Sequence, residues 1–147
     1  MSLFNPSRDQ VREFFFGLWA KSRSGEALTA LESMALSIAM EHPEYHEVLA
    51  NPGRYREREW RPEGGETNPF LHLSMHLAIE EQLSIDQPPG IREAVRRLAA
   101  KHDSAHDAKH AVMECLAEQV WQAQRNAVAF DNAAYLACLG VELPRDR

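Results

Sequence analysis

Two segments of this sequence repeat one pattern of potential metal ligands. HLSMHLAIE and HDAKHAVME share the spacing His-x3-His-x3-Glu, and the residues concerned are His72, His76 and Glu80, followed by His106, His110 and Glu114. Because an α-helix turns by about 100° per residue, residues four apart lie along one stripe of a helix. Imidazole nitrogens and carboxylate oxygens are ligands that proteins offer to divalent transition metals. The repeated pattern therefore predicts an interior site to which two helices contribute.

Both stripes lie on the apolar sides of their predicted helices. Leu73, Leu77 and Ile79 border the first stripe, and Met113 and Leu116 border the second. A buried carboxylate or charged imidazole is costly unless another group compensates it. A divalent ion (Fe, Zn, Mn or Ni) could do so by taking these side chains as ligands. Hydrogen bonds between the two stripes could also do so, and the sequence leaves both solutions open.

Two residues outside the stripes bear on this choice. His42 follows the apolar face of a predicted second helix, where it could add a ligand or orient one. The favoured interpretation of HPEYH is instead a helix-end elbow with a solvent-exposed His46. Arg125 could pair with Glu80 or Glu114, which would satisfy a buried carboxylate without metal.

The elements that must position these residues are helices. Apolar residues recur at three- and four-residue steps through most of the chain, and no strand-like alternation is present. The pattern predicts an all-α fold, a single-domain helical bundle of about five to six helices over residues 1–147. Asn68 and Pro69 begin the helix of the first stripe, which runs to about Ser84, and Ser104 begins that of the second, which runs to about Val128.

Residues 51–68 are expected to form the one long irregular segment of the bundle. Within it, RYREREWR places four arginines beside Tyr55 and Trp60, a composition that can bind single-stranded nucleic acid. A solvated loop, or a loop anchored on the bundle by Trp60, is the favoured interpretation, because two glutamates interrupt the run. If it covers the histidines, this loop is a candidate lid.

Charge and cysteine usage restrict the partners. The net charge is −6, with 22 acidic and 16 basic residues, which argues against binding to nucleic acids or anionic membranes. No apolar run approaches the ~20 residues that span a bilayer, and the N-terminus lacks a secretory signal pattern.

Cys115 and Cys138 lie in apolar surroundings far apart in the sequence, so reduced packing residues in a cytoplasmic protein are expected.

Four longer segments carry a resemblance to a known family. NPSRDQVREFFF, EHPEYH, NPFLHLSMHLAIEEQLSIDQPPGIR and HAVMECLAEQVWQAQRN are similar to the uncharacterised bacterial family called domain of unknown function 1841. Ala117 departs from the family pattern, in which a glycine commonly precedes the glutamate matching Glu118. The resemblance implies a small, all-helical cytoplasmic protein. It assigns a role to no residue, because the family has no assigned activity.

Two functions of different classes are compatible with these observations. The first is a metal-binding protein, an oxidoreductase or a hydrolase of unknown substrate, in which the four histidines of the stripes are ligands and the two glutamates ligate, bridge or act as base. The alternative is a non-catalytic interaction module, for example a homodimer, whose metal-free network fixes the register of the helices. In that case an exposed surface of Phe14, Phe16 and Trp19 would contact the partner.

Overall fold

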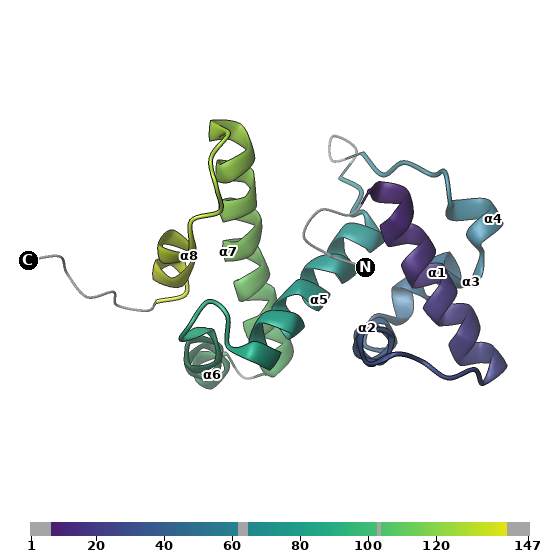
Figure 1. The fold of residues 1–147 in the computed structure, drawn as a ribbon, viewed down its shortest axis with the longest axis horizontal. Coiled ribbons are helices and arrows are strands. Elements are labelled where there is room, and N and C mark those ends of the chain that lie inside the picture. Colours follow the sequence, from purple (N-terminus) through teal and green to yellow (C-terminus); the bar gives the residue numbers. More distant parts are fainter. Residues whose placement is uncertain (1–6, 62–64, 103, 141–147) are drawn as a thin grey trace, which may run out of the picture. The chain divides into compact units, whose positions relative to one another are not determined.

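The structure is a computed structural model that describes residues 7–61, 65–102 and 104–140, apart from the side chains of Ala105 and His106. The described residues form helices and contain no strand, so the all-α prediction is confirmed. The chain divides into two compact units, residues 1–78 and 79–147. Their boundary falls inside one continuous helix, α5 (Figure 1). Among the described residues, none of the helices combines the length and apolarity needed to cross a bilayer.

Local sequence signals set the ends of the helices in the first unit. Its elements are α1 (Arg8–Ser24), α2 (Ala30–Met40), the 3-10 turn η1 (Pro43–Tyr45), α3 (His46–Ala50), α4 (Pro52–Tyr55) and the first part of α5 (Pro69–Ile85). Ser7 and Gln10 form a capping box at the start of α1, and Thr29 and Glu32 form another at the start of α2. Gly25 ends α1 with a φ of 76°, a conformation that glycine adopts without strain.

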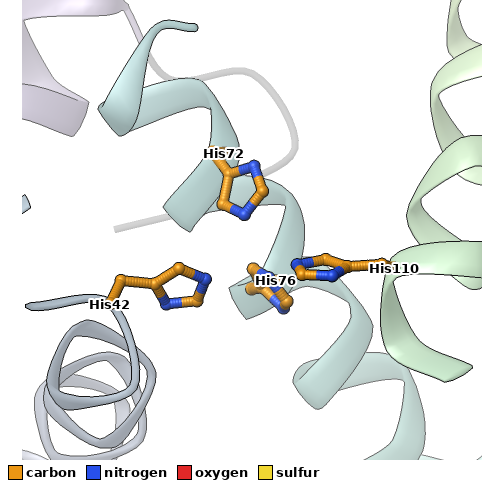
Figure 2. A group of neighbouring side chains, drawn as sticks. All are labelled: His42, His72, His76 and His110. Atoms are coloured by element: carbon orange, nitrogen blue, oxygen red, sulfur yellow. The ribbon is translucent and has the colours of Figure 1, made fainter. Parts of the chain in front are cut away.

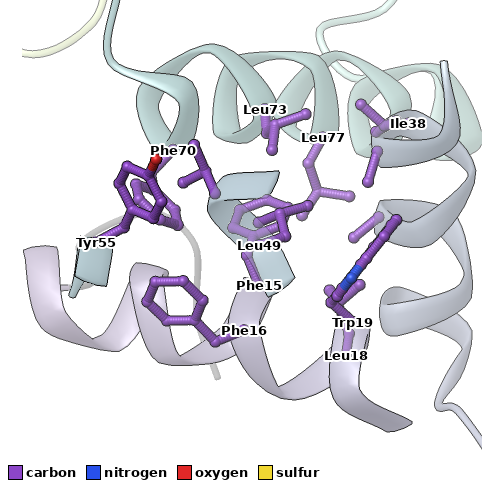
Figure 3. Close-up of a cluster of buried hydrophobic side chains, with 13 residues drawn as sticks. Phe15, Phe16, Leu18, Trp19, Ile38, Leu49, Tyr55, Phe70, Leu73 and Leu77 are labelled. Atoms are coloured by element: carbon purple, nitrogen blue, oxygen red, sulfur yellow. The ribbon is translucent and has the colours of Figure 1, made fainter. Parts of the chain in front are cut away.

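The core of the first unit lies between α1, α2, α3 and α5. Leu18, Leu49, Leu73 and Leu77 are almost completely buried there, together with Phe15 (Figure 3). Each helix contributes residues at three- and four-residue steps, so one face of each turns inward. The apolar residues between the histidines of α5 are therefore part of this core, as the sequence pattern predicts.

The prediction that Phe14, Phe16 and Trp19 of α1 form an exposed partner surface is wrong. Phe16 and Trp19 are only 4% and 3% exposed, and Phe14 is half-buried. Phe16 makes an edge contact with Phe70 of α5, with ring centroids 5.2 Å apart, and the ring of Trp19 lies 4.6 Å from that of His46. Because α1 is covered on several sides, it buries more of its circumference than the sequence alone indicates.

The segment 51–68 is more ordered than a plain loop. It begins with the single turn α4, which the sequence pattern does not predict, because four residues are too few to show a period. Trp60 stacks on Tyr55 and meets Phe70 edge-on, as expected for an anchoring residue. Three arginines of the segment form ion pairs within the chain, Arg54–Glu47, Arg56–Glu13 and Arg58–Glu66, and Glu59 of the segment pairs with Arg8 of α1.

The second unit contains the end of α5 followed by α6 (Ile91–Lys101), α7 (Ala105–Asn126) and α8 (Asn132–Cys138). A turn at DQPPG leads into α6, as predicted, and Asp86 accepts hydrogen bonds there from the backbone N–H groups of Arg92 and Gly90. These bonds, led by that of Arg92, lower the pKa of Asp86. Tyr135 of α8 is fully buried, and its hydroxyl donates to Gln82 over 2.8 Å.

Cys115 and Cys138 form a disulfide, so the prediction of reduced cysteines is wrong. Cys115 lies on α7 and Cys138 ends α8, and their Cα atoms are 5.8 Å apart, within the range that a disulfide spans. The two helices pack against each other, which brings together residues 23 positions apart. Such pairing depends on how helices pack, and the sequence spacing carries no sign of it.

Candidate metal site

Three histidines of the first unit meet at one point. His42 lies directly after α2, and His72 and His76 lie one turn apart on α5 (Figure 2). The ring centroids are 5.1 Å apart for His42 and His72, 4.8 Å for His42 and His76, and 4.9 Å for His72 and His76. Each ring offers one nitrogen, and these nitrogens lie within 4.8 Å of one another. The rings are thus arranged so that one ion could contact all three.

The position of His72 and His76 follows from the way α5 begins. The side chain of Asn68 accepts hydrogen bonds from the backbone N–H groups of Phe70, at 2.9 Å, and Leu71, at 3.2 Å. These bonds satisfy donors that the first turn of a helix leaves without helical partners. The burial of the neighbouring leucines then fixes the rotation of α5, so that its histidine stripe faces the end of α2.

The position of His42 follows from the proline after it. A residue that precedes proline is disfavoured in the helical conformation, and α2 accordingly ends at Met40. His42 adopts φ −124° and ψ 69°, outside the helical region, and Pro43 starts the next turn. The sharp change of direction holds the His42 side chain at the helix end, where it is 3% exposed.

One hydrogen bond defines which ring nitrogen of His42 carries a hydrogen. Its Nδ1 lies 2.8 Å from the carbonyl oxygen of Ile38, which can only accept. Nδ1 must therefore carry the proton, and in the neutral ring the lone pair is on Nε2. Metal-binding histidines commonly have this arrangement, in which one ring nitrogen donates to a carbonyl and the other faces the metal. His42 thus has the geometry of an oriented ligand.

Tyr45 forms an aromatic wall beside the three histidines. Its ring is parallel to that of His42, with centroids 5.6 Å apart, and it meets the ring of His72 edge-on at 5.8 Å. Burial raises the pKa of the Tyr45 phenol, and the neighbouring Glu44 carboxylate raises it further. The phenol is therefore neutral at physiological pH and contributes no charge to the site.

A comparison with models of protein families identifies the family of this chain. Residues 7–141 match the model of a domain of unknown function, DUF1841. The chain belongs to the DUF1841 family. The resemblance seen in the sequence is thereby confirmed. No curated protein and no solved structure matches the chain. Any function of this DUF1841 member must therefore be argued from its own site.

The structure brings together part of the predicted ligand set. His72 and His76 converge as expected, and His42 joins them, although the sequence favoured a helix-end role for it. His46, expected in solvent, is half-buried, and its Nε2 donates to the carbonyl oxygen of Ala39 over 2.8 Å. The signal that could have identified His42 is its place on the apolar face of a helix that a proline ends.

The remaining predicted ligands of this DUF1841 chain fall in the second unit. Glu80 is half-buried and forms an ion pair with Lys109, so a lysine and not Arg125 satisfies its carboxylate. Arg125, the predicted partner, instead lies 5.0 Å from the ring centroid of Trp121. Glu114 is exposed and His110 is half-buried on α7. The side chain of His106 lies outside the described residues.

Proposed function

We propose that this protein binds a divalent transition metal through the imidazoles of His42, His72 and His76. The observation that supports this most strongly is the convergence of three ring nitrogens within 4.8 Å, one of them on a ring already oriented by a carbonyl. Three protein ligands with further positions left for other groups are typical of catalytic zinc sites.

The chemistry of the ligands narrows the choice of metal. Neutral imidazoles suit zinc, nickel and iron, whereas magnesium and calcium prefer oxygen ligands. Among the metals predicted from the sequence, manganese forms the weakest complexes with nitrogen ligands. We therefore propose zinc first, then nickel or iron. With zinc the site would support hydrolysis, and with iron it would support redox chemistry.

We also propose His110 as a ligand, because it belongs to the repeated pattern of the sequence. Glu80 would have to give up Lys109, and Glu114 is exposed, so the proposal gives neither a coordinating role. His106 remains a prediction from the sequence. Single alanine variants of His106 and His110 would decide whether either residue contributes to metal affinity.

Metal analysis of the purified protein tests the proposal. The protein should be prepared without a histidine tag, stripped with a chelator, reloaded with zinc, and measured by inductively coupled plasma mass spectrometry. We expect one zinc per chain, and loss of that zinc in His42→Ala and His76→Ala. His46→Ala is the matched control, because His46 lies in the same segment but its Nε2 proton is donated to Ala39. Equal loss of zinc in the control would contradict the proposal.

A metal-free network is the second candidate function of these histidines. The hydrogen bond from His42 to Ile38 and the close ring contacts favour it, because both hold the three rings in place without an ion. In this case zinc would not bind to the native protein. His76→Ala would then lower the free energy of unfolding by about 2 kcal/mol or more, because it leaves a cavity and removes polar contacts.

A further inference from the structure

A groove runs between the second half of α1 and the short helices α3 and α4 of the first unit. Its volume is about 860 Å³, which falls within the roughly 300–1,000 Å³ of small-molecule sites. The lining residues used below are Phe16, Trp19, Ala20 and Arg23 of α1 and Leu49 and Ala50 of α3. None of the three converging histidines lines the groove, so it is distinct from the proposed metal site.

The floor of the groove is apolar. Phe16, Trp19 and Leu49 form it, and their side chains are almost completely buried (Figure 3). Ala20 and Ala50 line the groove from its two sides and are exposed, and their short side chains leave the floor open. A flat or chain-like apolar molecule in this groove would remove apolar surface from water, which favours binding.

Arg23 adds a positive charge to this apolar groove. Its guanidinium lies 4.6 Å from the ring centroid of Trp19, a contact that keeps the charge beside the floor. Among the residues that the structure describes, no carboxylate pairs with Arg23. Glu47, an acidic residue of the lining, forms an ion pair with Arg54, so its own charge is compensated. The groove therefore complements a ligand that carries a negative charge.

We propose that this groove binds a small amphipathic carboxylate, a molecule with an apolar body and one carboxylate group. The apolar body lies on Phe16, Trp19 and Leu49, and the carboxylate accepts hydrogen bonds from the guanidinium of Arg23. A planar guanidinium matches the two oxygens of a carboxylate. Binding is reversible and neither forms nor breaks a covalent bond. The inference goes beyond the proposed metal site and does not depend on it.

Titration of the full chain with 2-naphthoate, followed by proton–nitrogen correlation NMR, tests the proposal. We expect saturable shifts of the Trp19 indole N–H and of the Ala20 and Ala50 backbone amides, with a Kd of about 1 mM or lower. The uncharged compound 2-naphthamide has nearly the same shape. It should bind about three- to tenfold more weakly, because it lacks the charge that pairs with Arg23.

Two variants separate the charge from the groove. Arg23→Gln should reduce the affinity for 2-naphthoate to that for 2-naphthamide, and Arg8→Gln should leave both unchanged. Arg8 is the matched control, because it lies on the same helix outside the groove and its substitution alters the net charge equally. Ala20→Leu should weaken binding of both compounds, because leucine narrows the groove while remaining a good helix former.

The outcomes that would overturn the proposal are distinct. The absence of saturable shifts up to about 10 mM 2-naphthoate, or equal affinities for the acid and the amide, would overturn it. Equal losses in Arg8→Gln and Arg23→Gln would mean that binding follows net charge and not the groove. A native dimer that dissociates in Ala20→Leu would show that a second copy of the chain fills the groove instead. None of these outcomes bears on the metal proposal, whose test measures zinc in variants of His42 and His76.

Discussion

At the residue scale, Arg12 organises the segment that leads to the histidine helix. Its guanidinium is 2% exposed and donates to the carbonyl oxygens of Tyr55, Arg56 and Arg58, at 3.3, 2.8 and 2.7 Å. It also lies about 5 Å from an aromatic ring of α5 and from that of Trp60. Burial lowers the pKa of Arg12, and the charge of a neighbouring arginine adds to this effect. Because the ordinary pKa of an arginine is far above 7, Arg12 stays protonated at neutral pH.

We predict that Arg12→Lys lowers the free energy of unfolding by about 2–4 kcal/mol. A lysine keeps the charge but lacks the planar guanidinium that lies over the rings of Trp60 and Phe70. Urea denaturation followed by circular dichroism measures the change. Arg8→Lys is the control, because Arg8 is exposed and its ion pair with Glu59 is expected to contribute less than about 1 kcal/mol. Equal effects of the two substitutions would refute the role of Arg12.

At the element scale, the start of α2 combines a capping box with an ion pair. Glu32 accepts a hydrogen bond from the Thr29 backbone N–H over 2.9 Å and pairs with Lys21 at 3.0 Å. The Thr29 hydrogen bond is the main cause that lowers the pKa of Glu32 below its ordinary value of 4.5, and Lys21 adds to it. Because the pKa of Glu32 is lower in the folded state than in the unfolded state, its ionised carboxylate stabilises the fold at pH values above the ordinary pKa. This stabilisation is lost as the pH falls through the lowered pKa of the folded state.

We predict that Glu32→Gln removes this pH dependence. Glutamine can still accept the capping hydrogen bond, as Gln10 does at the start of α1, but it cannot ionise. The wild type should have the higher melting temperature at pH 7, and the difference should shrink below about pH 4.5 and vanish in stronger acid. Calorimetry of both proteins over this range measures the difference, from which other titrating groups cancel. A constant difference at all pH values would contradict the assignment.

The disulfide joins the last two helices, α7 and α8. We expect that breaking it lowers the free energy of unfolding by a moderate amount. A loop closed by a separation of 23 residues corresponds to about 3 kcal/mol. Tyr135, Leu136 and Leu139 are also buried, so we expect their apolar contacts to keep α8 packed after reduction. Urea denaturation with and without a reductant measures the change, and a Cys115→Ser, Cys138→Ser double variant should not respond to the reductant. Complete loss of helicity on reduction would show that the bond is essential to folding.

Elements of this protein differ in how far the sequence determines them. Ends of long helices were predictable, because caps such as Ser7, Asn68 and Ser104 act within three residues of their own position. Two of the three converging histidines were predictable for the same reason, since His72 and His76 share one helix. The position of His42 beside His72 and His76, and the pairing of the two cysteines, depend on packing between helices, which no local sequence pattern encodes.

At the scale of the whole molecule, two compact units share one helix. The first contains the apolar core around Leu73 and Leu77 and the three converging histidines, and the second contains the core around Tyr135 and the disulfide. A ligand that binds only the folded form stabilises the part of the chain whose folding it requires. Metal binding can therefore reveal whether the two units unfold together or separately.

We predict that zinc protects the two units unequally against hydrogen exchange. At a free zinc concentration about 100 times Kd, stabilisation reaches about 2.7 kcal/mol, which corresponds to roughly hundredfold slower exchange through unfolding. The backbone amides of α2, η1 and the first half of α5 should show this slowing, because they carry the three proposed ligands. The amides of α8 should not, because its contacts lie with α7 and Gln82. Exchange measured by mass spectrometry on peptides from both units tests this. Equal protection of α8 would mean that the chain unfolds as one cooperative body.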